Sequence, residues 1–168
     1  HMELAQPRSA SRRRGIAAAC LHGGIEPVQR RQTLSQLSDG SLRLLYLAPE
    51  RLQGEATRSV LQQHAATGQL VALAVDEAHC ISAWGHDFRP DYRRLGALRA
   101  LCPGVPLVAL SATAAPRVRA DILRLLHLRR PLIQVGSAQR HNLHYAMRRR
   151  VGDPLQDVVE ALNKARGA

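Results

Sequence analysis

The stretch LVALAVDEAHCISAWGHDFRPDY, residues 70–92, changes character at Asp76. The residues before Asp76 are all apolar, as expected for a short strand that is buried on both faces. Two acids, Asp76 and Glu77, follow this run directly. A carboxylate pair at the end of such a strand is the Walker-B arrangement, in which the Asp holds Mg²⁺ largely through water and the Glu activates the attacking water. On local grounds alone, an acid that caps the next helix is the competing interpretation.

On both sides of this stretch, similar apolar runs alternate with longer amphipathic segments. The runs that predict strands cover residues 16–21, 42–48, 70–75, 106–112 and 131–136. The stretches that predict helices cover residues 26–38, 49–67, 90–102, 115–128 and 153–165. This alternation implies βαβ crossovers and an α/β fold, a parallel open sheet with helices on both faces. Ligands of such folds bind beyond the carboxyl ends of the strands.

Composition and charge narrow the class of protein. The chain has 168 residues, enough for one domain, and a formal net charge of +11 with a pI of about 11.2. A surface this basic attracts polyanions, nucleic acid first. A lone basic tail at residues 1–14, which we expect to be disordered behind a cloning scar at residues 1–2, is the simpler explanation for part of the charge. No apolar run is long enough to span a membrane.

The cysteines and histidines do not predict a metal centre. Cys20, Cys80 and Cys102 are far apart and form no CxxC pair, so we expect reduced thiols in a cytoplasmic protein. His141 and His144 have HxxH spacing, but in an extended strand they would point to opposite faces. We therefore predict no zinc site.

Four segments together resemble one family. They are residues 73–99 (LAVDEAHCISAWGHDFRPDYRRLGALR), 43–52 (RLLYLAPERL), 15–21 (GIAAACL) and 110–114 (LSATA). The first resembles the DEAH box and aromatic-rich loop of RecQ-type DNA helicases, members of helicase superfamily 2. The resemblance covers residues 15–142. It implies an incomplete RecA-like (P-loop NTPase-type) helicase domain over residues 15–150, followed by a C-terminal helix over residues 151–168.

The resemblance also implies a function and its residues. The parent would be an ATP- and Mg²⁺-dependent helicase that moves 3′ to 5′ on single-stranded or partly unwound DNA. Asp76 and Glu77 would serve ATP hydrolysis, with Asp76 holding Mg²⁺ through water, and His79 would couple the nucleotide site to its surroundings. The residues expected to contact DNA are Trp84, His86, Phe88, Arg89, Tyr46, Pro49, Glu50 and Arg51. The residues expected to couple hydrolysis to strand separation are Ser111, Ala112, Thr113, Arg140 and Asn142.

Plainer interpretations compete with several of these roles. Trp84, Phe88 and Tyr92 are spaced by four and could form a buried helical stripe, although Gly85 and Pro90 interrupt it. Ser111 and Thr113 could be a simple turn with a hydroxyl cap, and residues 50–51 an ordinary helix start. The sequence also departs from the family at Ala83, and at residues 138, 139 and 141.

The phosphate-cradling motif GxxxxGK[ST] does not occur in this sequence, whose only lysine is Lys164. We therefore expect no ATP hydrolysis by this chain alone, because a P-loop neutralises the phosphates. Without a P-loop strand, sheet edges would be exposed, and we expect self-association through them. A non-catalytic DNA-binding or regulatory relative is the alternative. A metal-dependent hydrolase using Asp76, Glu77, His79 and His86 is a third and weaker one.

Overall fold

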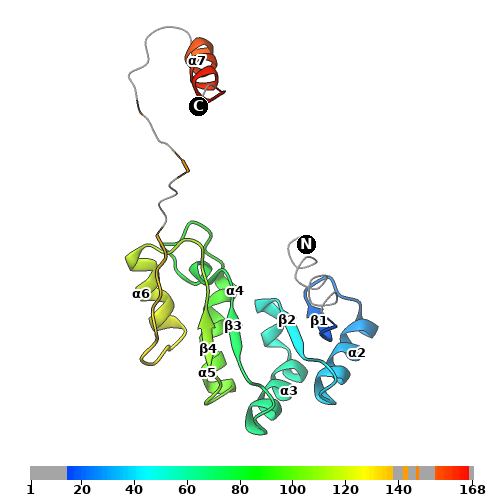
Figure 1. Ribbon diagram of the computed structural model, residues 1–168. Helices are drawn as coiled ribbons and strands as arrows, with labels where there is room; N and C mark the ends of the chain where they lie inside the picture. The colour runs from blue at the N-terminus through cyan, green and yellow to red at the C-terminus, as the bar shows by residue number, and fades with distance from the viewer. Residues whose placement is uncertain (1–14, 138–141, 144–146, 148–153, 167–168) are drawn as a thin grey trace. The chain divides into compact units, whose positions relative to one another are not determined.

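The computed structural model describes residues 15–137, 142–143, 147 and 154–166 (Figure 1). These residues fall into two compact units, with the boundary after Pro131. The first unit contains all the strands of the described residues, and the second contains the helix α7 (Pro154–Arg166). The boundary that the sequence suggested, after residue 150, lies outside the described residues.

Parallel pairs of short strands form the centre of the first unit. β1 (Ala18–Leu21) pairs with β2 (Leu44–Leu47), and β3 (Leu73–Val75) pairs with β4 (Leu107–Ala109). Each pair is joined through helices, which gives the βαβ connection that the alternating pattern predicted. The α/β class is therefore confirmed. In the described residues the strands form two small sheets of two strands each, where the sequence suggested one open sheet.

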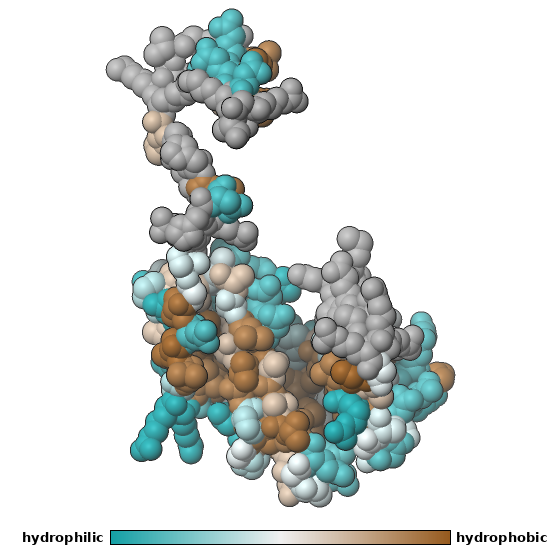
Figure 2. All heavy atoms as spheres, in the orientation of Figure 1, coloured by the Kyte–Doolittle hydropathy of each residue, from teal (hydrophilic) through white to brown (hydrophobic). Residues whose placement is uncertain are grey.

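The strand predicted over residues 131–136 is wrong. This segment is extended but belongs to no strand, because a strand needs a hydrogen-bonded neighbour and no described residue pairs with it. One edge of β4 is likewise unpaired within the described part of the chain. Val108 and Leu110, in and beside β4, are 48% and 51% exposed. Figure 2 shows hydrophobic surface gathered around this region of the first unit.

The predicted helices form near their expected bounds. All five predicted helices begin with a proline, at the start of α2, η1, α4, α6 and α7, where the missing N–H costs nothing. The helix expected over residues 49–67 is divided at Gly54, and the one expected over residues 90–102 is divided into three short pieces. The helices among the described residues of the first unit are α2 (Pro27–Ser38), η1 (Pro49–Gln53), α3 (Glu55–Ala66), η2 (Ala78–Ile81), α4 (Pro90–Arg93), η3 (Arg94–Ala97), α5 (Leu98–Leu101) and α6 (Pro116–Leu125).

The main core packs α3, α5 and α6 around β3. Its buried residues are Leu61, Val75, Ala78, Ile81, Leu95, Leu98, Leu101, Cys102, Val105, Val118, Ile122 and Leu126. A glycine permits the close approach of η3 to the end of α6, since a Cβ atom on Gly96 would lie 2.5 Å from the Leu125 carbonyl oxygen. The core therefore fixes the position of α6 relative to the segment that follows β3.

All three cysteines are buried, and they form no disulfide with one another. Burial raises the pKa of the Cys102 thiol above its usual value, so this thiol stays protonated at neutral pH. Within the described ranges, no helix combines the length and apolar character needed to cross a membrane.

Candidate functional site

The two acids lie directly after β3, at the carboxyl edge of its sheet. Asp76 is exposed, and its Oδ1 atom accepts a hydrogen bond of 2.9 Å from the Glu77 N–H group. Glu77 has a left-handed backbone with φ of 48°. This conformation costs a non-glycine residue about 1 kcal/mol or more, and such residues cluster at functional sites. The turn therefore holds two carboxylates at an exposed strand end at an energetic cost.

His79 links these acids to the turn after β4. The imidazole is buried, and its Nδ1 atom lies 3.2 Å from Glu77 Oε2 and 3.0 Å from Ser111 Oγ. The Ser111 hydroxyl donates its own proton to the Thr113 carbonyl oxygen, 2.9 Å away, so it can only accept from His79. Both partners of Nδ1 are therefore acceptors, which favours a proton on Nδ1, and the other ring nitrogen, Nε2, lies 3.7 Å from Cys80 Sγ.

Backbone hydrogen bonds hold the two strand ends in register. The Leu110 N–H group donates to the Val75 carbonyl, and the Ala78 N–H group donates to the Leu110 carbonyl, each over 2.8 Å. These contacts place the acids and residues 111–113 at the same edge of the sheet. Ala112 and Thr113 are exposed at the same turn.

The segment that follows η2 is a loop, and its aromatic side chains face solvent. Trp84 is 62% exposed and Phe88 38% exposed, and no residue from 82 to 89 is helical. The alternative of a buried helical stripe is therefore wrong. Because a helix does not form here, the side chains are not confined to one face.

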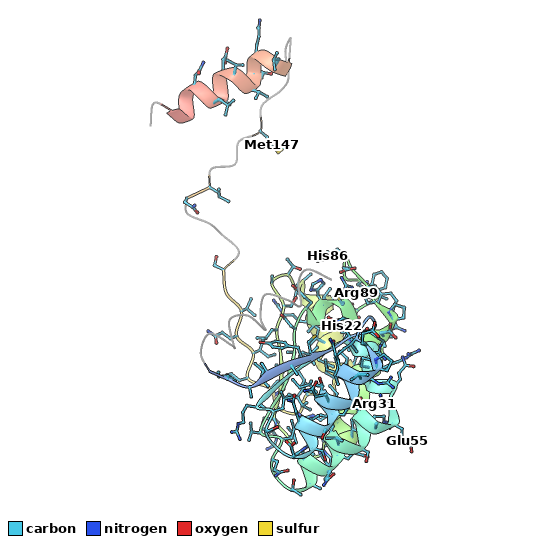
Figure 3. The ribbon with its side chains drawn as sticks, turned by 90° about the vertical axis from the view of Figure 1, so that its right-hand side faces the viewer. His22, Arg31, Glu55, His86, Arg89 and Met147 are labelled. Atoms are coloured by element: carbon cyan, nitrogen blue, oxygen red, sulfur yellow. The ribbon has the colours of Figure 1, made fainter. Side chains whose placement is uncertain are left out.

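This aromatic loop, residues 82–89, folds back over η2. The His86 ring stacks on the His79 ring with centroids 4.5 Å apart and planes 13° apart. A Cβ atom at Gly85 would lie 2.6 Å from the His79 carbonyl oxygen, so only glycine permits this fold of the backbone. His86 and Arg89 lie at the same end of the first unit (Figure 3). His86 of the loop thus contacts the face of the imidazole whose Nδ1 atom contacts Glu77.

Charged neighbours fix the far end of the loop. Arg89 forms a salt bridge of 2.6 Å with Asp87, and this hydrogen bond lowers the pKa of the Asp87 carboxyl below its usual range. Burial raises the pKa of the Cys80 thiol, and the nearby Asp87 raises it further. Arg93 lies over the Phe88 ring, 5.0 Å from its centroid. Arg89 is thus paired within the loop, with 57% of its side chain exposed.

Several residues attach the loop to α6, and the sequence analysis missed them. The buried Ser82 hydroxyl donates to Asp121 Oδ2 over 2.7 Å and accepts from the Trp84 N–H group over 3.2 Å. The Arg117 guanidinium lies 3.4 Å from the centroid of the Trp84 ring. Hydrogen bonds from Arg124, and then from Ser82, lower the pKa of Asp121. No spacing rule links positions so far apart, so only the packing of α6 shows these contacts.

The second group of expected DNA contacts lies elsewhere in the first unit. Tyr46 is half-buried in β2, Pro49 is half-buried, and Glu50 is exposed. Arg51 donates from Nε to the His22 carbonyl over 2.9 Å, and from one terminal nitrogen to the carbonyl that follows it over 2.7 Å. Arg51 therefore fastens η1 to the turn after β1, which leaves one terminal nitrogen for a further contact.

Two coupling candidates remain, Arg140 and Asn142. Arg140 lies outside the described residues. Asn142 is exposed in the second unit.

Two arrangements near the acids bear on metals. Asp76 can fit a hydrated Mg²⁺, because it is exposed and its Oδ2 atom has no hydrogen-bond partner among the described residues. His79, Cys80 and Asp87 also offer three ligand atoms within 4.8 Å of one another. That group suits a metal poorly, because Asp87 is already paired with Arg89.

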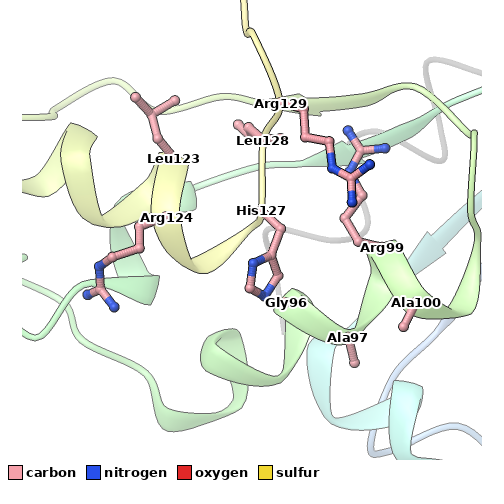
Figure 4. Close-up of a pocket in the computed structure, with 9 residues that line it drawn as sticks. All are labelled: Gly96, Ala97, Arg99, Ala100, Leu123, Arg124, His127, Leu128 and Arg129. Atoms are coloured by element: carbon pink, nitrogen blue, oxygen red, sulfur yellow. The ribbon is translucent and has the colours of Figure 1, made fainter.

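A separate pocket of about 730 Å³ lies between η3 and α5 on one side and the end of α6 with the turn after it on the other (Figure 4). Its lining residues are Gly96, Ala97, Arg99, Ala100, Leu123, Arg124, His127, Leu128 and Arg129. Arg99 donates to the Val105 carbonyl over 2.9 Å. The lining contains no carboxylate, and no residue of the acid edge contributes to it. This basic pocket is therefore distinct from the site formed by Asp76 and Glu77.

Comparisons with known proteins show the family to which this sequence belongs. Residues 3–122 match the family model for the DEAD/DEAH box helicase. The chain is 38% identical over 135 residues to the ATP-dependent helicase SGS1 of Saccharomyces cerevisiae, covering 80% of this chain and 9% of that protein. It is 39% identical over 133 residues to the ATP-dependent DNA helicase RecQ of Pasteurella multocida, covering 79% of this chain and 20% of that protein.

A third relative is the bifunctional 3′-5′ exonuclease/ATP-dependent helicase WRN of Mus musculus, 41% identical over 140 residues, with coverage of 83% of this chain and 10% of the relative. The chain thus spans only about a tenth to a fifth of the length of these relatives. The resemblance to RecQ-type helicases that the motifs indicated is confirmed. Its sequence, its strand-end acids and the family match together show that the chain belongs to the DEAD/DEAH box helicase family.

Proposed function

We propose that this chain is the part of a RecQ-type, ATP-dependent 3′-5′ DNA helicase that carries the hydrolysis acids and the loop that senses single-stranded DNA. The observation that carries the proposal is the position of His79. Its Nδ1 atom contacts Glu77 and Ser111, while its ring face contacts His86 of the aromatic loop. One buried side chain thus joins the elements that would handle nucleotide and DNA.

Each acid has a separate task in this proposal. Asp76 would hold Mg²⁺ through water, and the ion would supply positive charge to the phosphoryl group being transferred. Glu77 would orient the attacking water and accept its proton. His79 holds the Glu77 carboxylate by donating its Nδ1 proton, so it is a positioning residue. Ser111, Ala112 and Thr113 would move with this contact, since the Ser111 hydroxyl shares the same proton.

The aromatic loop would bind single-stranded DNA by stacking. An aromatic side chain that stacks on a base contributes roughly 1–3 kcal/mol, and the sequence of the DNA matters little. Trp84 and Phe88 are exposed as such stacking requires, and Arg89 and His86 lie beside them. The net charge of +11 would add attraction to phosphates. Tyr46, Pro49, Glu50 and Arg51 would contact the DNA backbone further along.

A titration with a labelled single-stranded oligonucleotide tests the DNA part of this proposal. Trp84→Ala should weaken binding roughly 5- to 150-fold, which corresponds to the loss of one stacked base. Val71→Ala is the matched control, because Val71 is a large apolar side chain that is 77% exposed outside the loop. Equal affinities of the two variants would show that the loop does not bind the strand.

Hydrolysis needs a separate measurement. The sequence contains no GxxxxGK[ST] motif, so we propose that this chain alone does not hydrolyse ATP. A phosphate-release assay with ATP, single-stranded DNA and Mg²⁺ should give the same background rate of hydrolysis for the unchanged chain and for Asp76→Ala. A rate clearly above that of the variant would contradict the proposed inactivity.

A non-catalytic relative that binds DNA or regulates a helicase is the second candidate. The exposed Trp84 and the net charge of +11 favour it, since both serve DNA binding without nucleotide. Binding of a nucleotide analogue with Mg²⁺, measured by calorimetry, separates the two. If the chain binds the nucleotide analogue and Asp76→Ala abolishes this binding, the result supports the helicase portion. If the chain binds DNA but no nucleotide analogue, the result supports the non-catalytic relative.

We also propose that copies of this chain associate through β4. Its outer edge has no partner in the described part of the chain, and the side chain of Val108 in this strand is 48% exposed. Unpaired edges of this kind pair with other chains, and lysine on an edge prevents this. Light scattering should show species larger than a monomer, and Val108→Lys should restore the monomer. A monomer at high concentration without the substitution would contradict the proposal.

A further inference from the structure

Arg117 covers one face of the most exposed aromatic ring of the loop. Its guanidinium carbon lies 3.4 Å from the centroid of the Trp84 ring, a separation typical of parallel stacking. Trp84 nevertheless remains 62% exposed, so the rest of the indole is open to solvent. Arg117 is the second residue of α6, directly after Pro116, and thus belongs to an element outside the loop.

A second link fixes the indole relative to the same helix. The Trp84 N–H group donates to Ser82, and Ser82 donates to Asp121, which lies one turn after Arg117 on α6. The loop residue is therefore attached to α6 through its backbone and through its ring. Two attachments of this kind restrict the ring to one orientation, which lowers the entropy lost when a base stacks on it.

The Arg117 guanidinium keeps hydrogen-bonding capacity for an anion. The nearest acid on its helix, Asp121, is paired with Arg124 over 2.7 Å, and Arg117 forms no salt bridge among the described residues. A guanidinium that stacks through its face presents its N–H groups at its edge. The edge of this group can therefore reach a phosphate beside the Trp84 ring.

We propose that Arg117 and Trp84 together form a clamp for one nucleotide of single-stranded DNA. A base stacks on the open face of Trp84, Arg117 supports the opposite face, and the edge of Arg117 binds the adjoining phosphate. This inference rests on the proposed DNA-binding function and extends it to α6, whose first residues follow the turn that contains Ser111. Arg117 would thus be both a DNA-contacting and a positioning residue.

A gate is the competing role for the same contact. If Arg117 occupied the place of the base, DNA would have to displace it, and removing Arg117 would strengthen binding. In the clamp, removing Arg117 weakens binding, because the phosphate contact and the fixed ring are both lost. The two roles therefore predict changes of opposite sign.

The chain's only tryptophan makes the test direct, since tryptophan fluorescence reports on this ring alone. Single-stranded DNA should quench the fluorescence of the unchanged chain, and Arg117→Gln should raise the Kd about fivefold. Arg58→Gln is the matched control, because Arg58 is an exposed arginine on α3 and its loss changes the net charge equally. Circular dichroism confirms that both variants are folded.

The dependence of affinity on salt provides a second measurement. Arg117→Gln should reduce the slope of log K against log salt concentration by about 0.7, which is the value for one phosphate contact on a single strand. This reduction is counted in excess of any change in slope seen with Arg58→Gln. Arg117→Lys should restore the slope but only part of the affinity, because an ammonium does not stack as a plane.

Equal Kd values for Arg117→Gln and Arg58→Gln would overturn the clamp and leave the proposed DNA binding intact. Tighter binding by Arg117→Gln would also overturn the clamp and establish the gate. Absence of any quenching or binding by the unchanged chain would overturn the clamp and the DNA-binding function together.

Discussion

The Ser82 hydroxyl, one of the two links between the aromatic loop and α6, should contribute measurably to the stability of the fold. This residue is fully buried, donates to Asp121 Oδ2 over 2.7 Å and accepts from the Trp84 N–H group over 3.2 Å. Ser82→Ala removes both hydrogen bonds. A hydrogen bond to a carboxylate contributes about 1.5–3 kcal/mol, and water can reach the loop N–H group in its place. We therefore expect a loss of about 2–3 kcal/mol of unfolding free energy.

Urea unfolding, followed by circular dichroism, measures this loss. For a domain of this size, the free energy of unfolding falls by about 1–3 kcal/mol per molar urea. The expected loss therefore lowers the urea concentration at the unfolding midpoint by roughly 1 M or more. The fluorescence of Trp84 should move to a more solvated state in the folded variant as well. Ser59→Ala, an exposed serine on α3, should stay within about 0.5 kcal/mol of the unchanged chain.

The effect of Ser82→Ala should depend on pH in a defined direction. The pKa of Asp121 is lowered in the folded chain, so its interactions stabilise the fold above the carboxyl's ordinary pKa of about 3.9. This contribution disappears as the pH falls through the folded pKa. The difference between Ser82→Ala and the unchanged chain should therefore be full at pH 7 and shrink below about pH 4. A loss no larger than that of Ser59→Ala at pH 7 would refute the reasoning.

Two further variants test the backbone around the site. Gly85→Ala should destabilise the chain by about 1–3 kcal/mol in a thermal unfolding measurement, because its Cβ atom would lie 2.6 Å from a backbone oxygen. Gly136→Ala, which has open space around its Cβ position, should leave the stability unchanged in the same measurement. Arg51→Ala should lower the free energy of unfolding by about 1–3 kcal/mol, because two hydrogen bonds to carbonyl groups are lost. Arg58→Ala, at an exposed position, should lower it little. Equal urea midpoints for the two variants would show that Arg51 does not stabilise the fold.

The sequence predicted the elements whose signals are local. A proline at the first position of α2 and of α6, and the uninterrupted apolar run before Asp76, are properties of single segments. The shared edge of Asp76 and Ser111 followed from the parallel direction of β3 and β4. These inferences needed no knowledge of how the helices pack.

What the sequence could not predict depends on neighbours far along the chain. The segment 131–136 has the composition of a strand, but a strand forms only beside a partner. Arg51 has the motif position of a DNA contact, yet its guanidinium binds two carbonyl groups after β1. Arg117 reaches Trp84 only because the packing angle of α6 brings them together. Neither periodicity nor motif spacing contains that angle.

The geometry around His79 suggests how the two halves of the site could influence each other. Its single Nδ1 proton faces two acceptors, Glu77 and Ser111, at nearly equal distances of 3.2 Å and 3.0 Å. A movement of either acceptor therefore strengthens the hydrogen bond to the other. Because His86 stacks on the same ring, we propose that a shift of the loop on binding DNA rotates the imidazole and changes this balance. In that proposal, coupling needs only a small motion of one buried ring.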